Sequence, residues 1–121
     1  MALNRGNLGF TDAIQAGQTT SVYTVGSAQT AYIKGILLHN LSTLDIQNAK
    51  IHVVPNSGGS PGTAGTTTQV ARIGISTNDT FFFEPAYPIT LGSNGDSIQI
   101  ENEGSALSAL NVLVLGDKEV W

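Results

Sequence analysis

The sequence contains no cysteine, so neither a disulfide framework nor a thiolate metal site is available to it. Its 4 prolines and its lack of a glycine period exclude a collagen-like chain. No apolar run approaches the ~20 residues that cross a bilayer. Because 40% of the residues are hydrophobic and few are charged, the chain does not belong to the disordered class either. What remains is one small globular domain of 121 residues.

Charge is scarce, with five basic and nine acidic side chains and a formal net charge of −4. Binding to nucleic acid or to an anionic membrane depends on clustered Lys and Arg. The basic residues here are dispersed, and we expect neither partner. They are Arg5, Lys34, Lys50, Arg72 and Lys118. A polar but uncharged surface, rich in Gly, Ser and Thr, favours contact with other protein instead.

The hydrophobic pattern has a period of two residues more often than 3.6, which is typical of strands. The expected strands cover 19–25, 30–40, 48–54, 69–76, 80–84, 96–102 and 109–115. Short strands at this spacing, with turn residues between them, predict a single all-β domain of seven to eight strands, an antiparallel β-sandwich or jelly-roll-like fold.

Two segments do not follow this pattern. Residues 1–17 have isolated apolar positions between glycines, and we expect an extended N-terminal arm, with a short helical turn over Thr11 to Ala16 as an option. Residues 18–121 would then form the β-sandwich domain. The connection 56–67 holds four glycines and a proline, and structureless loops of this length are often mobile or functional.

The strand 30–40 carries apolar residues on both faces, so we expect it to be central and at least partly covered on both sides. Gly35 within it predicts a bulge or a close approach of another group. Strict alternation places Tyr32, Lys34, Ile36 and Leu38 on one face and Ile33, Gly35, Leu37 and His39 on the other.

No pattern of catalytic residues stands out. The serines lie in Gly-rich loops or on strand faces without a nucleophile elbow, and the acidic pairs show no context of a buried acid. A zinc site would need His39, His52 and a carboxylate such as Asp45, brought together by a hairpin of 30–40 with 48–54. The alternative, solvated or strand-end histidines, is favoured. We therefore expect no enzyme activity, no metal and no cofactor.

Aromatic residues pose the sharpest question. In the run Phe81-Phe82-Phe83, the middle ring points away from its neighbours, so one face must be covered by something other than a single core layer. Either a loop covers it or a neighbouring subunit does. Trp121 poses the same choice, because an indole left in water exposes a large apolar area.

Three stretches resemble small all-β virion structural proteins of tailed bacteriophages. They are ILLHN followed by IHVVP, then FFFEPAYPITLGSNGDSIQI, then ALNVLVLGD, and together they cover residues 30 to 117. The resemblance implies a non-enzymatic protein of the virion. We favour a capsid cement (decoration) protein that binds the major capsid protein on the outer head surface and stabilises contacts between capsomers.

Such proteins often form dimers or trimers, so a homo-oligomer is also expected. The expected contact residues are apolar and lie in the arm, the long loop, the aromatic strand and the tail, and they are Leu3, Leu8, Phe10, Pro61, Phe81, Phe82, Phe83 and Trp121. Two alternatives stay open. One is a neck, tail or fibre component of the same particle, and the other is a carbohydrate-binding or adhesion module.

Overall fold

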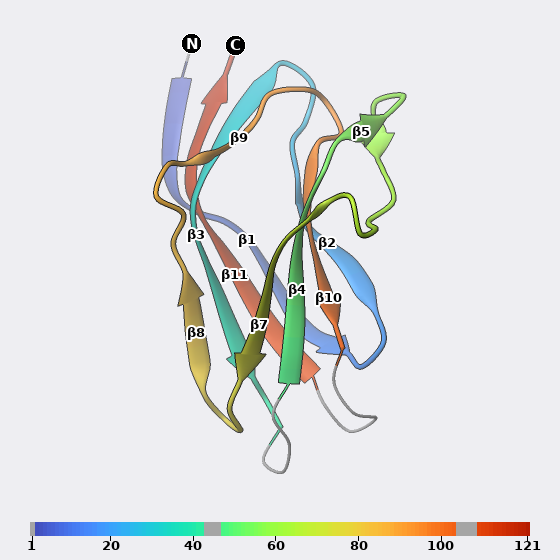
Figure 1. Ribbon diagram of the computed structural model, residues 1–121. Coiled ribbons are helices and arrows are strands. Elements are labelled where there is room, and N and C mark those ends of the chain that lie inside the picture. The colour runs from blue at the N-terminus through green and yellow to red at the C-terminus, as the bar shows by residue number, and fades with distance from the viewer. Residues whose placement is uncertain (1, 43–46, 104–108) are drawn as a thin grey trace.

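Two antiparallel sheets pack face to face (Figure 1) in the computed structural model, which describes residues 2–42, 47–103 and 109–121. Sheet A contains, in spatial order, β1 (Ala2–Gln15), β11 (Ala109–Val120), β3 (Gln29–Asn40) and β8 (Thr80–Phe83), with β9 (Ile89–Leu91) also paired to β3. Sheet B contains β2 (Thr19–Thr24), β10 (Ser97–Asn102), β4 (Gln47–Val54) and β7 (Gln69–Ile75). A small hairpin joins β5 (Asn56–Ser57) to β6 (Ser60–Pro61). The predicted all-β sandwich is confirmed.

The connectivity is that of a jelly roll. Strands β8 and β9 both pair with β3 and together act as one interrupted strand, and the β5–β6 hairpin lies outside both sheets. Counted along the chain, sheet A then has the order first, eighth, third, sixth, and sheet B has the order second, seventh, fourth, fifth. Two interlocked Greek keys of this kind define the double-sheet jelly roll.

The core lies between the sheets and is built of β-branched and leucine side chains. Sheet A contributes Ile33, Ile36 and Leu38 from β3, and sheet B contributes Ile98 and Ile100 from β10, all of them fully buried. Alternation along each strand sends these residues inward and their neighbours outward.

In the part of the chain that the structure describes, no helix is long and apolar enough to cross a membrane.

A β-bulge corrects the expected faces of β3. Leu115 pairs with Gly35, but the next residue of β11, Gly116, pairs with Ile33, so Lys34 is an extra residue without a direct partner. An extra residue reverses the alternation on either side of it. Ile33 and Ile36 therefore both point into the core, although strict alternation places them on opposite faces.

The N-terminal segment also differs from its expected form. It is extended, but it is an integral edge strand that pairs with β11 from Ala2↔Val120 to Gln15↔Ala109, and Thr11 to Gln15 are strand rather than helical turn. Two register shifts, between Asn7 and Gly9 and between Thr11 and Ile14, interrupt its period of two, which hid the strand in the sequence.

Two buried asparagines fasten the strand ends. The Asn40 amide donates to the backbone oxygens of Ile75 and Ser76 at 3.0 and 3.1 Å, which ties the end of β3 to the end of β7. The Asn102 amide donates to the oxygen of Ile14 at 2.8 Å and ties β10 to β1. These bonds hold sheet A against sheet B at the end of the sandwich opposite the chain termini (Figure 1).

Candidate functional site

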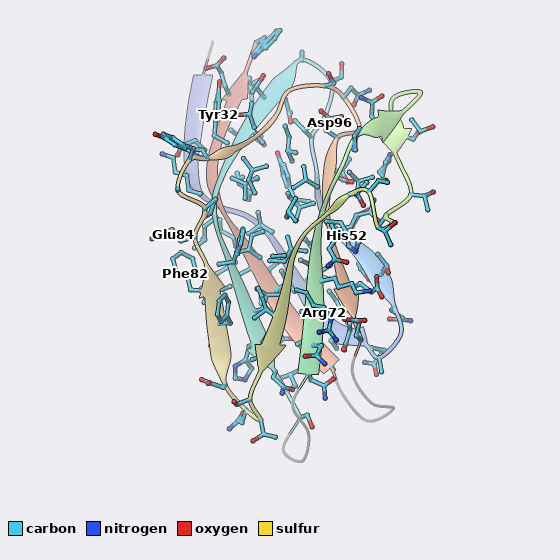
Figure 2. All side chains as sticks on the ribbon, in the orientation of Figure 1. Tyr32, His52, Arg72, Phe82, Glu84 and Asp96 are labelled. Carbon is cyan, nitrogen blue, oxygen red and sulfur yellow. The ribbon has the colours of Figure 1, made fainter. Side chains whose placement is uncertain are left out.

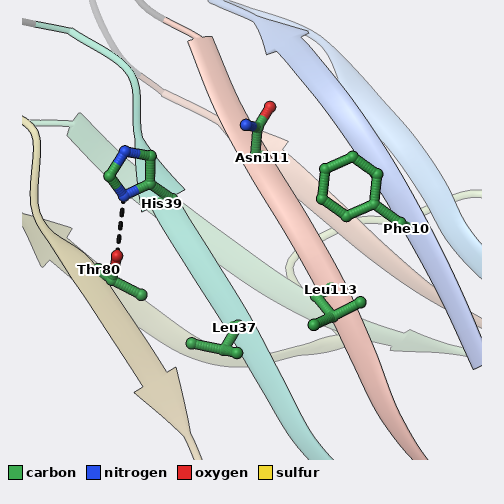
Figure 3. Close-up of a pocket in the computed structure, with 6 residues that line it drawn as sticks. All are labelled: Phe10, Leu37, His39, Thr80, Asn111 and Leu113. Carbon is green, nitrogen blue, oxygen red and sulfur yellow. Dashed lines mark hydrogen bonds between the residues drawn. The ribbon is translucent and has the colours of Figure 1, made fainter. Parts of the chain in front are cut away.

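An uninterrupted row of apolar side chains crosses the outer face of sheet A. The register pairs Phe10 of β1 with Leu113 of β11, Leu113 with Leu37 of β3, and Leu37 with Phe82 of β8. Residues directly opposite each other in a sheet share a face, so these four side chains form one line across all four strands. Figure 3 shows Phe10, Leu113 and Leu37 along this line. We call the four residues the apolar row.

The apolar row is open to solvent. Phe10 is 59% exposed and Phe82 is 46% exposed, while the two leucines between them are half-buried. In a two-layer sandwich the outer face of an antiparallel sheet is usually polar. Within the described residues, no segment of the chain folds over the row.

Polar side chains border one side of the apolar row. Asn111, His39 and Thr80 occupy the adjacent cross-strand positions, and His39 Nδ1 lies 2.8 Å from Thr80 Oγ1. These three residues and three members of the apolar row, Phe10, Leu113 and Leu37, line a shallow pocket of about 220 Å³ (Figure 3). Its floor is apolar and its polar groups stand along one side.

Gly35 lies on the other side of the apolar row. The Phe82 ring lies over this glycine, and an added Cβ would overlap the ring. Beyond it, the bulge residue Lys34 forms an ion pair with Asp117, with Nζ 2.6 Å from Oδ2. The face thus has an apolar centre and a polar rim, which is the usual anatomy of a protein–protein interface.

The outer face of sheet B has the opposite character. Lys50 lies 3.2 Å from Glu103 and 3.8 Å from Glu101, and Arg72 Nε donates to Glu103 at 2.8 Å. The Arg72 hydrogen bond is the main reason that the pKa of Glu103 lies below its ordinary value, with Lys50 adding to the effect. Figure 2 shows Arg72 and His52 on the side of the molecule away from Phe82. The basic residues Lys50 and Arg72 on this face are thus paired with the acidic residues Glu101 and Glu103.

The Gly-rich connection covers part of sheet B and is not an open loop. Its residues form the β5–β6 hairpin, and the oxygen of Gly62 accepts a 2.9 Å hydrogen bond from the Gln99 amide. His52 is 2% exposed beneath it, with Nδ1 3.0 Å from Thr68 Oγ1. This part of sheet B is thus covered by the connection itself.

A second group of exposed residues lies at the end of the sandwich that carries the two chain termini. Trp121 is 70% exposed, so its indole does not pack onto the core, and its backbone nitrogen donates to the oxygen of Ala28 at 2.9 Å. The β5–β6 hairpin with Pro61 lies at this same end (Figure 1). We call this region the Trp121 end.

The structure does not bring together the histidines that were considered for a zinc site. Strands β3 and β4 belong to different sheets, so the hairpin that would have joined His39 to His52 does not exist, and the two rings lie on opposite outer faces. Asp45 lies outside the described residues. Among residues 2–42, 47–103 and 109–121, no group of three or more His, Cys, Asp or Glu side chains is placed to hold a metal ion.

The structure separates the predicted contact residues into groups. Phe10 and Phe82 are the two ends of the apolar row, whereas Leu8 and Phe83 are partly buried and pack against the core. Phe81 pairs with the inward-facing Leu38 and is 39% exposed at the sheet edge. Pro61 and Trp121 lie at the Trp121 end, where the backbone of Leu3 pairs with Glu119.

Sequence reasoning missed Leu37 and Leu113, the two central members of the apolar row. Both stand in strands with apolar residues on both faces, so periodicity did not separate the inner face from the outer one. The available signal was this double apolar character itself. In a sandwich of only two layers it requires an apolar outer face.

A scan of protein-family models finds no match to the chain, and a search of curated proteins finds none either. Solved structures resemble it over nearly its full length at low identity. The virus-like particle of the extra small virus of the prawn Macrobrachium rosenbergii has a TM-score of 0.49 at 9% identity, covering 100% of this chain and 82% of that one.

Two further structures come from a pilus and from another virus. The Bacillus endospore appendage, a disulfide-linked pilus, has a TM-score of 0.46 at 17% identity and covers 98% of this chain and 87% of its own. The nora virus structure has a TM-score of 0.45 at 16% identity, covering 99% of this chain and 61% of that one. These are proteins of virus particles and pili, and not specifically of tailed phages. All three scores are below 0.5, so the chain's own residues must indicate what it binds.

Proposed function

We propose that this chain is a non-enzymatic structural protein of a bacteriophage particle, a capsid cement protein that binds the outer surface of the head. The observation that carries the proposal is the apolar row. A face with Phe10 and Phe82 in water is costly for a free protein, and contiguous exposed apolar patches with polar rims usually mark binding sites for other proteins.

The distribution of charge supports binding by shape rather than by electrostatic steering. The cations of sheet B, Lys50 and Arg72, are engaged by Glu101 and Glu103, and Lys34 on sheet A is engaged by Asp117. A protein of this kind gains its strength on a lattice from many copies, because each additional contact adds avidity even when a single contact is weak.

The Trp121 end provides the second surface that a cement protein needs. Its indole is exposed, the backbone nitrogen of Trp121 is bonded to Ala28, and exposed aromatic residues often contribute strongly to interfaces. In this proposal the major capsid protein contacts the Trp121 end, and the apolar row contacts a neighbouring subunit.

Particles of the phage that encodes this chain, assembled without it, provide the test. Purified protein added back should bind in hundreds of copies and raise the temperature at which the heads release their DNA. Binding of three, six or twelve copies would favour the neck or tail alternative, and the absence of any binding would contradict the proposal. A positive glycan array would favour the carbohydrate-binding alternative, since jelly rolls also serve as lectins.

A further inference from the structure

We infer that the apolar row binds a second copy of this chain, related by a two-fold axis that runs parallel to the strands. The proposed function leaves open which subunit contacts the apolar row, and this inference names it as a second copy of the chain. It rests on the geometry of the outer face of sheet A and not on binding to a capsid.

The apolar row reads the same in both directions. From β1 to β8 it runs phenylalanine, leucine, leucine, phenylalanine, that is Phe10, Leu113, Leu37 and Phe82. A two-fold axis through its centre and parallel to the strands places Phe10 of one copy on Phe82 of the other. The same axis places Leu113 on Leu37. Self-complementarity of this kind is what an isologous interface requires.

The borders of the row select this axis over the perpendicular one. Rotation about an axis along the row would turn the polar side, with His39 and Asn111, onto the side that carries Leu115. His39 Nδ1 and Asn111 Oδ1 already have partners in Thr80 and Ala13, but the remaining nitrogens of these two side chains would then face an apolar side chain, which is costly. The axis parallel to the strands instead brings His39 of one copy over Asn111 of the other, so hydrogen-bonding groups meet each other.

Charge and area are compatible with a copy of the same face. Lys34 and Asp117 are paired within the chain, so two such faces do not repel each other through these two residues. Two further charged residues, Asp12 of β1 and Glu84 after β8, are exposed and lie at opposite edges of the sheet. Sheet A is four strands wide and β11 is 12 residues long. Standard strand spacings give such a face about 750 Å². A standard interface buries about 800 Å² per partner, so the dimer requires face-to-face packing of nearly the whole sheet.

This arrangement has a consequence for the particle. An axis parallel to the strands leaves the two Trp121 ends at the same end of the dimer. One dimer could then place two indoles on the same capsid surface, which makes the cement unit bivalent. The perpendicular axis would point the two ends in opposite directions.

Sedimentation equilibrium of the purified chain tests the interface in the absence of any particle. The wild type should show twice the 12.6 kDa mass of one chain at micromolar concentration. Leu37→Asp buries an unpaired carboxylate in the centre of the dimer and should raise the dissociation constant at least about 100-fold. Val70→Asp is the matched control, because Val70 is 53% exposed on β7 of sheet B, and it should remain dimeric.

Circular dichroism of each variant establishes that it is folded. If Leu37→Asp does not fold, Phe10→Asp replaces it, because Phe10 lies on an edge strand and is 59% exposed. A monomeric wild type, or a Leu37→Asp variant that stays dimeric, overturns the inference. A monomer that still binds capsids would leave the proposed function standing, whereas a dimer that binds none would contradict only that function.

Disulfide trapping tests the direction of the axis, and because the chain has no native cysteine, only the introduced cysteines can form disulfides. Phe10 and Phe82 of one copy are three strands apart, about 14 Å, which is beyond the reach of a disulfide within the chain. Mixing Phe10→Cys with Phe82→Cys protein should give a cross-linked heterodimer much faster than either variant alone. Faster cross-linking of Phe10→Cys with itself would overturn the parallel axis.

Discussion

The ring of Phe82 occupies the space that a side chain at position 35 would need, because Gly35 lies directly beneath it on the neighbouring strand. Gly35 has no left-handed backbone angle, so its small size matters here and its flexibility does not. Glycine in a strand interior ordinarily weakens the strand. At this position it lets the Phe82 ring, the last member of the apolar row, pack against the neighbouring strand.

Replacement of Gly35 by alanine should therefore displace Phe82 without unfolding the domain. The gain of about 0.5–1 kcal/mol that alanine brings to a strand is offset by the overlap with the ring, so the melting temperature should change little. The dimer dissociation constant should rise about tenfold. Sedimentation equilibrium and thermal melting together measure both effects, with Gly65→Ala as control because nothing lies within 4 Å of its added Cβ.

Neighbouring leucines on β3 should respond in different ways to alanine. Leu38 is fully buried, and Leu38→Ala should lower the free energy of unfolding by about 2–5 kcal/mol through the cavity it leaves. Leu37 points outward, and Leu37→Ala should cost the monomer about 1 kcal/mol or less while weakening self-association. Urea denaturation at a protein concentration below the dimer dissociation constant measures the stability of the monomer alone and so separates it from the effect on self-association. Equal losses would contradict the assignment of the faces.

Acid should weaken the contact between the loop before β10 and the β5–β6 hairpin. Burial alone would raise the pKa of Asp96, but hydrogen bonds from the Asn56 side chain and backbone, with those from Ser93 and Gly92, outweigh it and hold the pKa below its ordinary value. A carboxylate with a lowered pKa stabilises the fold above its unfolded-state pKa, and this contribution is lost as the pH falls through the folded-state value.

Asp96→Asn should cost about 1–2 kcal/mol near neutral pH, where the charged acceptor is lost. It should also flatten the fall in stability between about pH 5 and pH 2 relative to wild type. Asp12→Asn, at an exposed position of β1, serves as the control for the substitution itself. Urea midpoints across this range provide the measurement, and a slope unchanged in Asp96→Asn would refute the role of the carboxylate.

Trp121→Ala tests the second surface. Because the indole is 70% exposed, its removal should change the melting temperature by no more than about 2 °C. On particles assembled without the protein, the variant should bind at least about tenfold more weakly than wild type, as expected for an aromatic anchor. Tyr87→Ala, which removes another highly exposed aromatic residue, is the control for a general loss of aromatic surface.

The sequence predicted the strands of this fold well where alternation is regular. The segment 96–102 lies in the middle of sheet B with Ile98 and Ile100 inward, as expected from its pattern. Prediction failed where an extra residue breaks the alternation, at Lys34 in β3 and at two places in β1. A bulge depends on pairing with a distant strand, so local periodicity does not reveal it.

The same reasoning explains how much of the candidate site was foreseen. Phe10 was expected as a contact residue because it is an isolated apolar residue of the expected arm, and Phe82 because the middle ring of three consecutive phenylalanines points away from its neighbours. That they share one row with Leu113 and Leu37 follows only from the register of four strands, in which β11 lies between β1 and β3. Long-range order of this kind is a property of the jelly roll and not of any one segment.

The location of the chain in an intact phage particle tests the central claim most directly. A cryo-electron microscopy map should show the domain in hundreds of copies on the outside of the head, with the apolar row buried against a second copy and Trp121 against the capsid shell. A map in which the domain is absent from the head, or in which Leu37 and Leu113 face open solvent, would contradict the account.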